Sequence, residues 1–332
     1  MTSIESHQPR LPGRRQFLAL GVGAFVIAAL PRAARPRRRL VRRQLPIMGT
    51  IAEIGVVHHD PRWAHGAIDA ALGELVRVDR TMSRFRADSD VGRANAGAFS
   101  RPVAVGAVTM FVVEESLRWA AASDGRFDPA LGGASALWEV TRRHAPPPSG
   151  EVHRWARRQL WRAVEPGRSG GAPALLFHDP DAALDLGGIA KGYGVDRAVD
   201  ALRRWGIRDA LVTAGGDLYA LGRSEDGDPW EIGVQSPFDP AELVATFHVE
   251  DRGVATSGDY ERFFVHAHQR YHHLLDPDTG APLRTPRHSV TVTGSSCMAA
   301  DAAGTTAFGL DRAAAQRLLA AVDPSLVIAN IT

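Results

Sequence analysis

The sequence predicts an α+β fold, in which helices and strands mix along the chain without a strict βαβ repeat. Segments with apolar residues at helical spacing alternate irregularly with short segments of strand-like composition, and turn residues separate them. Hydrophobic and charged residues make up 45% and 23% of the chain, as in ordinary folded proteins. We therefore divide the 332 residues into a leader with a basic linker, residues 1–43, and one mixed sheet-and-helix domain, residues 44–332.

The leader has the features of an export signal. Arg14 and Arg15 precede Phe17 and an apolar run over residues 18–30, which as a helix would rise only about 20 Å, short of a bilayer core of about 30 Å. Paired arginines before a mild apolar run are typical of twin-arginine signals. We expect a periplasmic or other extracytoplasmic protein. Its leader is either cleaved or retained as a membrane anchor, and any membrane contact is through this leader only. A disordered basic tail is the alternative.

The remaining elements are predicted from periodicity and turn residues. In the first half they are a strand at 45–57, a helix at 61–82, a polar loop at 83–97, a helix at 109–123 and a surface segment at 145–171 around a short helix near 152–160. In the second half the strands are 182–186, 210–214, 230–235, 246–250, 253–255, 289–293 and 326–331; the helices are 189–205, 298–308 and 312–322; and a hairpin at 262–275 ends in a turn at 276–280.

Charge and cysteine content exclude several classes of function. Residues 1–43 hold ten arginines and one acidic residue, which leaves 29 of the 39 basic and 36 of the 37 acidic residues in the domain, a net charge of −7. An acidic domain without basic stretches between aromatic residues is atypical of nucleic-acid binding, so we expect no nucleic-acid partner. The single cysteine, Cys297, excludes an intramolecular disulfide and a Cys-rich zinc site.

One lysine, Lys191, stands among 38 arginines, directly after a predicted strand and the pair Gly187-Gly188. Its compact ammonium suits a phosphate or a cluster of carbonyls where a planar guanidinium would not fit. The chain has no GxxxxGK[ST] or GxGxxG motif, but a Gly-Gly turn before a helix still offers backbone N–H groups to an anion. A tight strand-to-helix turn that needs small residues is the alternative.

Asp301 and Thr305 lie four residues apart on a predicted helix, so that a carboxylate and a hydroxyl share one face. With a backbone carbonyl they form an incomplete oxygen shell, which suits Mg²⁺ because phosphate oxygens and water complete its octahedron. The alternative is an aspartate that favours the helix N-terminus and a threonine bonded to its own backbone.

Eight short motifs follow one another between residues 48 and 310. They are Met48-Gly49-Thr50; Met82-Ser83-Arg84-Phe85 with Asp88-Ser89-Asp90; Asp124-Gly125-Arg126-Phe127-Asp128; Asp185 to Tyr193; Ala214-Gly215-Gly216-Asp217-Leu218; Ala255-Thr256-Ser257-Gly258-Asp259-Tyr260; His273-Leu274-Leu275-Asp276-Pro277-Asp278-Thr279-Gly280; and Ser289-Val290-Thr291-Val292 leading to Cys297-Met298-Ala299-Ala300-Asp301 and Thr305. In identity and order they resemble the ApbE family, the FAD:protein FMN transferases.

The resemblance implies an ApbE-like fold and a role for each matching residue. The Gly188 carbonyl, Asp301 and Thr305 match the residues that hold one or two Mg²⁺ ions, and Asp301 or His273 matches a base for the acceptor hydroxyl. The residues that match contacts to FAD are Met48, Phe85, Asp128, Asp185, Lys191 and Leu275. The family often has tyrosine where this chain has Phe85. Phenylalanine can still stack on the flavin, but it cannot make the hydrogen bond of a phenol.

The implied reaction moves FMN from FAD to a Thr or Ser hydroxyl of a client protein and releases AMP. The clients that the resemblance suggests are electron-transfer or reductase proteins. Two other functions stay open: an FAD pyrophosphatase that forms FMN and AMP with water, and a non-enzymatic exported flavin-binding protein. An FAD-dependent oxidoreductase is less favoured, because no redox motif is present.

Overall fold

The computed structural model describes residues 17–18, 25–28, 38–239 and 241–332. The predicted signal, with Arg14 and Arg15, lies outside the described residues except for two short strands, β1 (Phe17–Leu18) and β2 (Phe25–Ala28). Strand β2 pairs with β10 (Trp230–Gln235). The described part of the chain contains no helix with the length and apolarity needed to span a membrane.

The helices are α1 (Pro61–Met82), α2 (Asp90–Gly97), α3 (Ala107–Ala122), α4 (Gly132–Trp138), α5 (Ser149–His153), the 3-10 helix η1 (Leu160–Ala163), α6 (Ala190–Arg204), α7 (Cys297–Ala307) and α8 (Arg312–Val322). The longer strands are β3 (Arg39–Ile47), β4 (Thr50–His58), β6 (Val164–Ser169), β7 (Ala172–Phe177), β8 (Ala210–Ala214), β9 (Asp217–Leu221), β10 (Trp230–Gln235), β11 (Leu243–Val249), β12 (Arg252–Gly258), β17 (Ser289–Gly294) and β18 (Val327–Ile331). The shorter strands are β5 (Val103–Ala104), β13 (Phe263–His266), β14 (Gln269–His272), β15 (Leu275–Asp276) and β16 (Ala281–Pro282).

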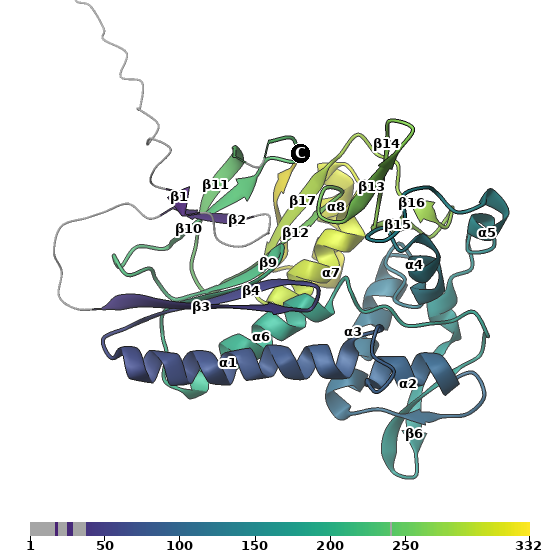
Figure 1. Ribbon diagram of the computed structural model, residues 1–332, viewed down its shortest axis with the longest axis horizontal. Coiled ribbons are helices and arrows are strands. Elements are labelled where there is room, and N and C mark those ends of the chain that lie inside the picture. The colour runs from purple at the N-terminus through teal and green to yellow at the C-terminus, as the bar shows by residue number, and fades with distance from the viewer. Residues whose placement is uncertain (1–16, 19–24, 29–37, 240) are drawn as a thin grey trace, which may run out of the picture.

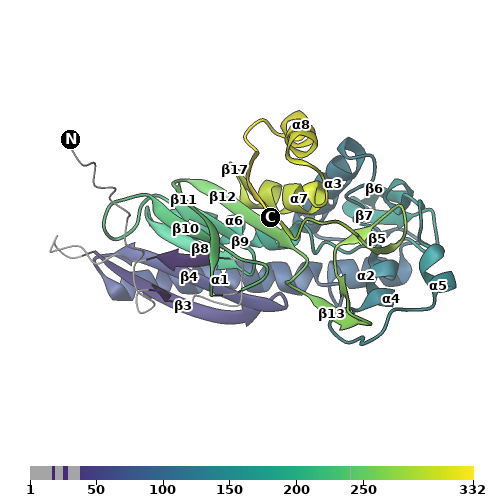
Figure 2. The same ribbon diagram turned by 90° about the horizontal axis from the view of Figure 1, so that it is seen from above.

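A seven-stranded antiparallel sheet, in the order β18-β17-β12-β9-β8-β4-β3, forms the centre of the molecule. Helices α1 and α6 cover one face, and β10 and β11 cover the other (Figure 1). A second lobe, made of α2 to α5 and the sheet β5-β7-β6, lies at one end of the elongated molecule (Figure 2). Helix α7 packs on β12 and β17 and against this lobe, so it lies where the two parts meet.

Local signals explain the elements that were predicted correctly. Asp60 caps α1 by accepting hydrogen bonds from the backbone N–H groups of Arg62 and Trp63, and Pro61 occupies its first turn. The buried side chains of α1 recur at helical spacing, as predicted, and pack on α6 and β4. The predicted α+β fold is confirmed, as are the helices α3, α6, α7 and α8 and the hairpin β13-β14.

The predicted strand over 45–57 is wrong in detail, because the region is a hairpin of β3 and β4. Met48 and Gly49 both have positive φ angles, 54° and 69°, and join the strands in a two-residue turn between the paired residues Ile47 and Thr50. The apolar pattern continues through both strands and hides the turn. Strand β3 starts at Arg39, so the end of the predicted linker belongs to the sheet.

Three further predictions in the second lobe are wrong. Residues 90–97 form α2 rather than a loop, because Ser89 caps it by accepting from Gly92 N–H at 2.8 Å. Residues 145–171 include β6 as well as a helix, and β6 pairs with β7. Residues 182–186 are no strand: the Asn95 side-chain amide bonds both the N–H and the C=O of Leu184, where a neighbouring strand would otherwise pair.

Gly192 allows α6 to approach α7 closely. A Cβ atom there would lie 2.3 Å from the carbonyl oxygen of Cys297 and 2.8 Å from Cβ of Asp301. We expect Gly192→Ala to lower the free energy of unfolding by about 1–3 kcal/mol, measured by urea denaturation. Gly73→Ala on α1, where nothing lies within 4 Å, is the control and should stabilise the protein by about 0.5–1 kcal/mol. Equal stability of the two variants would contradict this account of the packing.

Candidate active site

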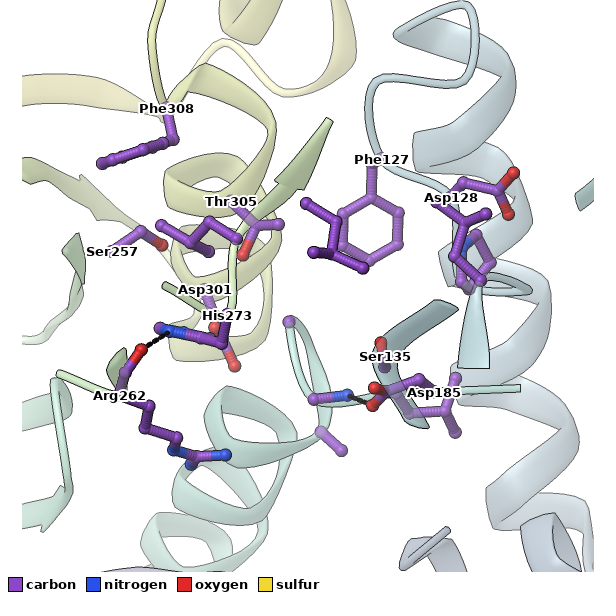
Figure 3. Close-up of a pocket in the computed structure, with 18 of the residues that line it drawn as sticks. Phe127, Asp128, Ser135, Asp185, Ser257, Arg262, His273, Asp301, Thr305 and Phe308 are labelled. Carbon is purple, nitrogen blue, oxygen red and sulfur yellow. Dashed lines mark hydrogen bonds between the residues drawn. The ribbon is translucent and has the colours of Figure 1, made fainter. Parts of the chain in front are cut away.

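A cavity of about 570 Å³ lies between the sheet, α7 and the second lobe. All ten residues that the sequence singled out line it: Met48, Phe85, Asp128, Asp185, Gly188, Lys191, His273, Leu275, Asp301 and Thr305. Figure 3 shows Asp301, Thr305 and His273 on one side of the cavity and Asp128 and Asp185 on the other. The polar residues of α7 therefore face the second lobe across the space where a ligand would lie.

Lys191 stands at the start of α6 between two buried carboxylates. Its Nζ atom lies 2.9 Å from Oδ2 of Asp217, 3.2 Å from Oδ1 of Asp301 and 3.3 Å from the Gly187 carbonyl oxygen. Burial alone would lower the pKa of Lys191, but the charges of Asp217 and Asp301 outweigh it and raise the pKa, so the ammonium stays charged. Burial and the neighbouring Asp301 raise the pKa of Asp217.

Helix α7 presents Asp301 and Thr305 one turn apart, as predicted. Asp301 accepts from the backbone N–H of Gly192 at 3.0 Å, which adds the N-terminus of α6 to its partners. A Cβ at position 188 would lie 2.9 Å from Oγ1 of Thr305, so only glycine lets the loop before α6 come this near. Within the described part of the chain, the Thr305 hydroxyl has no hydrogen-bond partner, unlike that of Thr306, which bonds the Ala302 carbonyl at 2.7 Å.

The other end of the cavity is more apolar and partly open. The Phe85 ring is 64% exposed, and the guanidinium of Arg84 stacks over it at 4.1 Å. Arg84 also pairs with Asp185 at 3.1 Å, and the second Asp185 oxygen accepts from Gly187 N–H at 3.0 Å. Met48 occupies the left-handed turn of the β3-β4 hairpin, which holds its side chain at the cavity wall. An aromatic ring would find stacking partners at this end.

Asp128 is the most constrained of the predicted contacts. Burial raises its pKa to about 6, although backbone N–H groups, among them that of Ala130 at 2.9 Å, oppose the rise. Its second carboxyl oxygen is buried without a hydrogen-bond partner in the described structure. A ligand or water that donates a hydrogen bond would satisfy this oxygen.

Sequence reasoning missed three residues at this site. Asp217 was named only within the motif Ala214 to Leu218 and given no role, although an acid at the start of a strand is unusual enough to have raised the question of a partner. Glu261 and Arg262, just before β13, also line the cavity. In the described part of the chain, no three His, Cys, Asp or Glu side chains converge as a metal cluster.

His273 follows β14 and faces the cavity. Its backbone N–H donates to the Arg262 carbonyl at 3.2 Å, and its Nδ1 lies 3.4 Å from the same oxygen. Burial lowers the pKa of His273 to about 3, and the positive charge of Arg262 contributes. The imidazole is therefore neutral near pH 7, and an Nδ1–H directed at the carbonyl leaves Nε2 free to accept a proton or hydrogen bond.

This depressed pKa predicts how stability depends on pH. In the unfolded chain His273 binds a proton below its ordinary pKa of 6.5, whereas in the folded protein it stays neutral down to about pH 3. The free energy of unfolding therefore falls as the pH drops from 6.5 to about 3. We expect His273→Gln to remove about 1–3 kcal/mol of the loss between pH 6.5 and about 4.5, measured by urea denaturation at each pH. The exposed His65→Gln variant is the control. A wild-type pH dependence in His273→Gln would refute the assignment.

Comparisons with known proteins give the same identity as the motifs. The model of the ApbE family matches residues 48–328. An FAD:protein FMN transferase of Vibrio cholerae is 34% identical over 268 residues, 78% of each chain, and one of Treponema pallidum is 34% identical over 290 residues, 83% of this chain and 80% of that one.

Solved structures agree with this match. The ApbE protein of Thermotoga maritima superimposes with a TM-score of 0.78 at 29% identity, over 89% of this chain and 96% of that one. The flavin transferase ApbE of Vibrio cholerae gives 0.70 at 31% identity, over 85% and 91%. With the family model covering most of the domain and these relatives covering most of their own length, the chain belongs to the ApbE family.

Proposed function

We propose that this protein transfers the FMN moiety of FAD to a Ser or Thr hydroxyl of a client protein. The observation that carries the proposal is the division of the cavity. One end holds a charged lysine, a carboxylate and a free hydroxyl around Lys191, Asp301 and Thr305, and the other holds Phe85 and Met48. FAD has a matching division, with a pyrophosphate that needs positive charge and a flavin ring that stacks on aromatic and apolar groups.

We further propose that Mg²⁺ binds at the Gly188 carbonyl, Asp301 and Thr305. The three oxygens suit a hard cation, and the close approach of position 188 to a Thr305 hydroxyl without a protein partner fits a shared ligand. The bound ion, or a pair of ions, would offset negative charge that develops on the pyrophosphate. Lys191 contributes a further positive charge beside Asp301.

The reaction forms one P–O bond and breaks another. The client hydroxyl oxygen attacks the phosphorus on the FMN side, the bond from this phosphorus to the bridging oxygen breaks, and AMP leaves with that oxygen. The hydroxyl proton passes to a base, for which neutral Nε2 of His273 or a carboxylate oxygen of Asp301 is available. Because the pKa of His273 is about 3, it is a weak base and accepts the proton only as the hydroxyl begins to bond to phosphorus. Positioning and charge compensation then supply most of the catalysis.

The test is mass spectrometry of an acceptor incubated with the full-length protein, FAD and Mg²⁺. The acceptor protein of the Vibrio cholerae relative serves as the probe, and the relative itself is the positive control. We expect the mass of one FMN on a Ser or Thr, release of AMP and no reaction in EDTA. Free FMN and AMP with an unmodified acceptor would indicate an FAD pyrophosphatase, and intact bound FAD would indicate a flavin-binding protein.

Two variants test the residues. We expect Asp301→Ala to lower kcat by roughly 10²–10³-fold, because the proposed metal site loses its only carboxylate. Lys191→Arg should lower kcat by about tenfold or more despite the unchanged charge, because a planar guanidinium does not fit between Asp217 and Asp301. Arg77→Lys, the reverse exchange at an exposed position of α1, is the control. Full activity in either site variant would show that its residue is wrongly assigned.

We also propose that residues 1–43 direct export by a twin-arginine route, so that transfer takes place outside the cytoplasm. Replacement of Arg14 and Arg15 by lysine should hold the protein in the cytoplasm, because the pair is the recognition element of such signals. Cell fractionation and immunoblotting measure the outcome, with Arg10→Lys as the control. Unchanged export of the double variant would exclude this route.

A further inference from the structure

A second cavity, of about 550 Å³, adjoins the first. It lies between the turn that joins β3 to β4 and the turn that joins β8 to β9. The two cavities share five lining residues, which are Gly49, Lys191, Gly216, Glu261 and Arg262. None of Phe85, Asp128 and Leu275, which line the first cavity, lines the second. The two spaces therefore meet at Lys191.

We propose that this second cavity admits the acceptor segment of the client protein, and that Glu261 and Arg262 bind the backbone of that segment. The inference rests on the proposed transferase function. In-line transfer needs the attacking and leaving oxygens on opposite sides of the phosphorus. The second cavity reaches Lys191 from outside the first, so it offers the nucleophile an approach while a dinucleotide occupies the first cavity.

Glu261 and Arg262 have the chemistry to recognise an extended peptide. No hydrogen bond or ion pair joins either side chain to another residue in the described structure. The Glu261 carboxylate is partly buried, with one oxygen 3.5 Å from where a Cβ of residue 216 would lie. The charges of Lys191 and Arg262 attract this carboxylate without a hydrogen bond to it, so its oxygens and the Arg262 guanidinium can bond the N–H and C=O groups of a backbone.

The walls of the cavity leave room for that backbone. Gly49, Gly215 and Gly216 line it, and the first two have positive φ angles that glycine adopts without strain. A Cβ at position 216 would lie 2.7 Å from the Thr256 carbonyl oxygen, so the turn stays free of a side chain at the junction.

The experiment fills part of the second cavity with a large side chain, placed at a residue that lines this cavity and not the first. Pro46 is exposed on β3 and lines the second cavity but not the first. In the full-length protein we expect Pro46→Trp to raise KM for the acceptor protein of the Vibrio cholerae relative by about tenfold, with the Kd for FAD unchanged. Gln44→Trp, on the same strand and outside the cavity lining, is the matched control and should change neither.

Glu261→Gln gives a second test that does not add bulk. It should raise the acceptor KM by about tenfold, because a neutral amide is a weaker hydrogen-bond acceptor than a carboxylate. An unchanged acceptor KM in both variants would overturn the inference. A rise in the Kd for FAD of Pro46→Trp, measured by flavin fluorescence, would also overturn it, because part of the dinucleotide would then lie in this cavity. If the wild-type protein binds FAD and never modifies the acceptor that the relative modifies, the proposed function fails and the inference fails with it.

Discussion

The contact of Lys191 with Asp217 and Asp301 holds three separate parts of the fold at one point. Lys191 lies in the first turn of α6, Asp217 begins β9 and Asp301 lies on α7. Both carboxylates are nearly fully buried, so each depends on its partner to offset the cost of leaving water. The pairing requires the start of α6 to lie close to α7, and the glycines at 188 and 192 allow this close approach. The same contacts therefore pack α6 against α7 and position the charged side chains of the active site.

The charge balance of this contact explains why it suits phosphate chemistry. One ammonium faces two carboxylates, and the N-terminus of α6 adds only a partial positive charge through the Gly192 N–H. Burial and the neighbouring charge of Asp301 raise the pKa of Asp217, and the proposed Mg²⁺ beside Asp301 would offset part of that charge. The proposed cation would therefore serve the protein's own carboxylates as well as the pyrophosphate of the substrate.

Local signals in the sequence predicted much of the fold and most residues of the site. They did not predict contacts between segments that lie far apart in the sequence. A capping aspartate and a proline set the start of α1, and family motifs named ten residues that line one cavity. The Met48-Gly49 turn was missed because apolar residues continue across it. The predicted strand at 182–186 failed because the Asn95 side chain, far along the chain, takes the place of a strand. The ion pair of Asp217 with Lys191 was not predicted, because the two residues come together only in the folded protein.

The single lysine of an arginine-rich chain can now be explained by its surroundings. Its Nζ atom approaches Asp217, Asp301 and the Gly187 carbonyl within 2.9–3.3 Å, and these three acceptors come from different segments. A point charge with three rotatable donors can reach acceptors in three directions, whereas a guanidinium directs its donors within one plane. The same surroundings that keep Lys191 charged also place it where the two cavities meet. The positions of these acceptors, rather than the net charge of the site, therefore explain why lysine suits this position better than arginine.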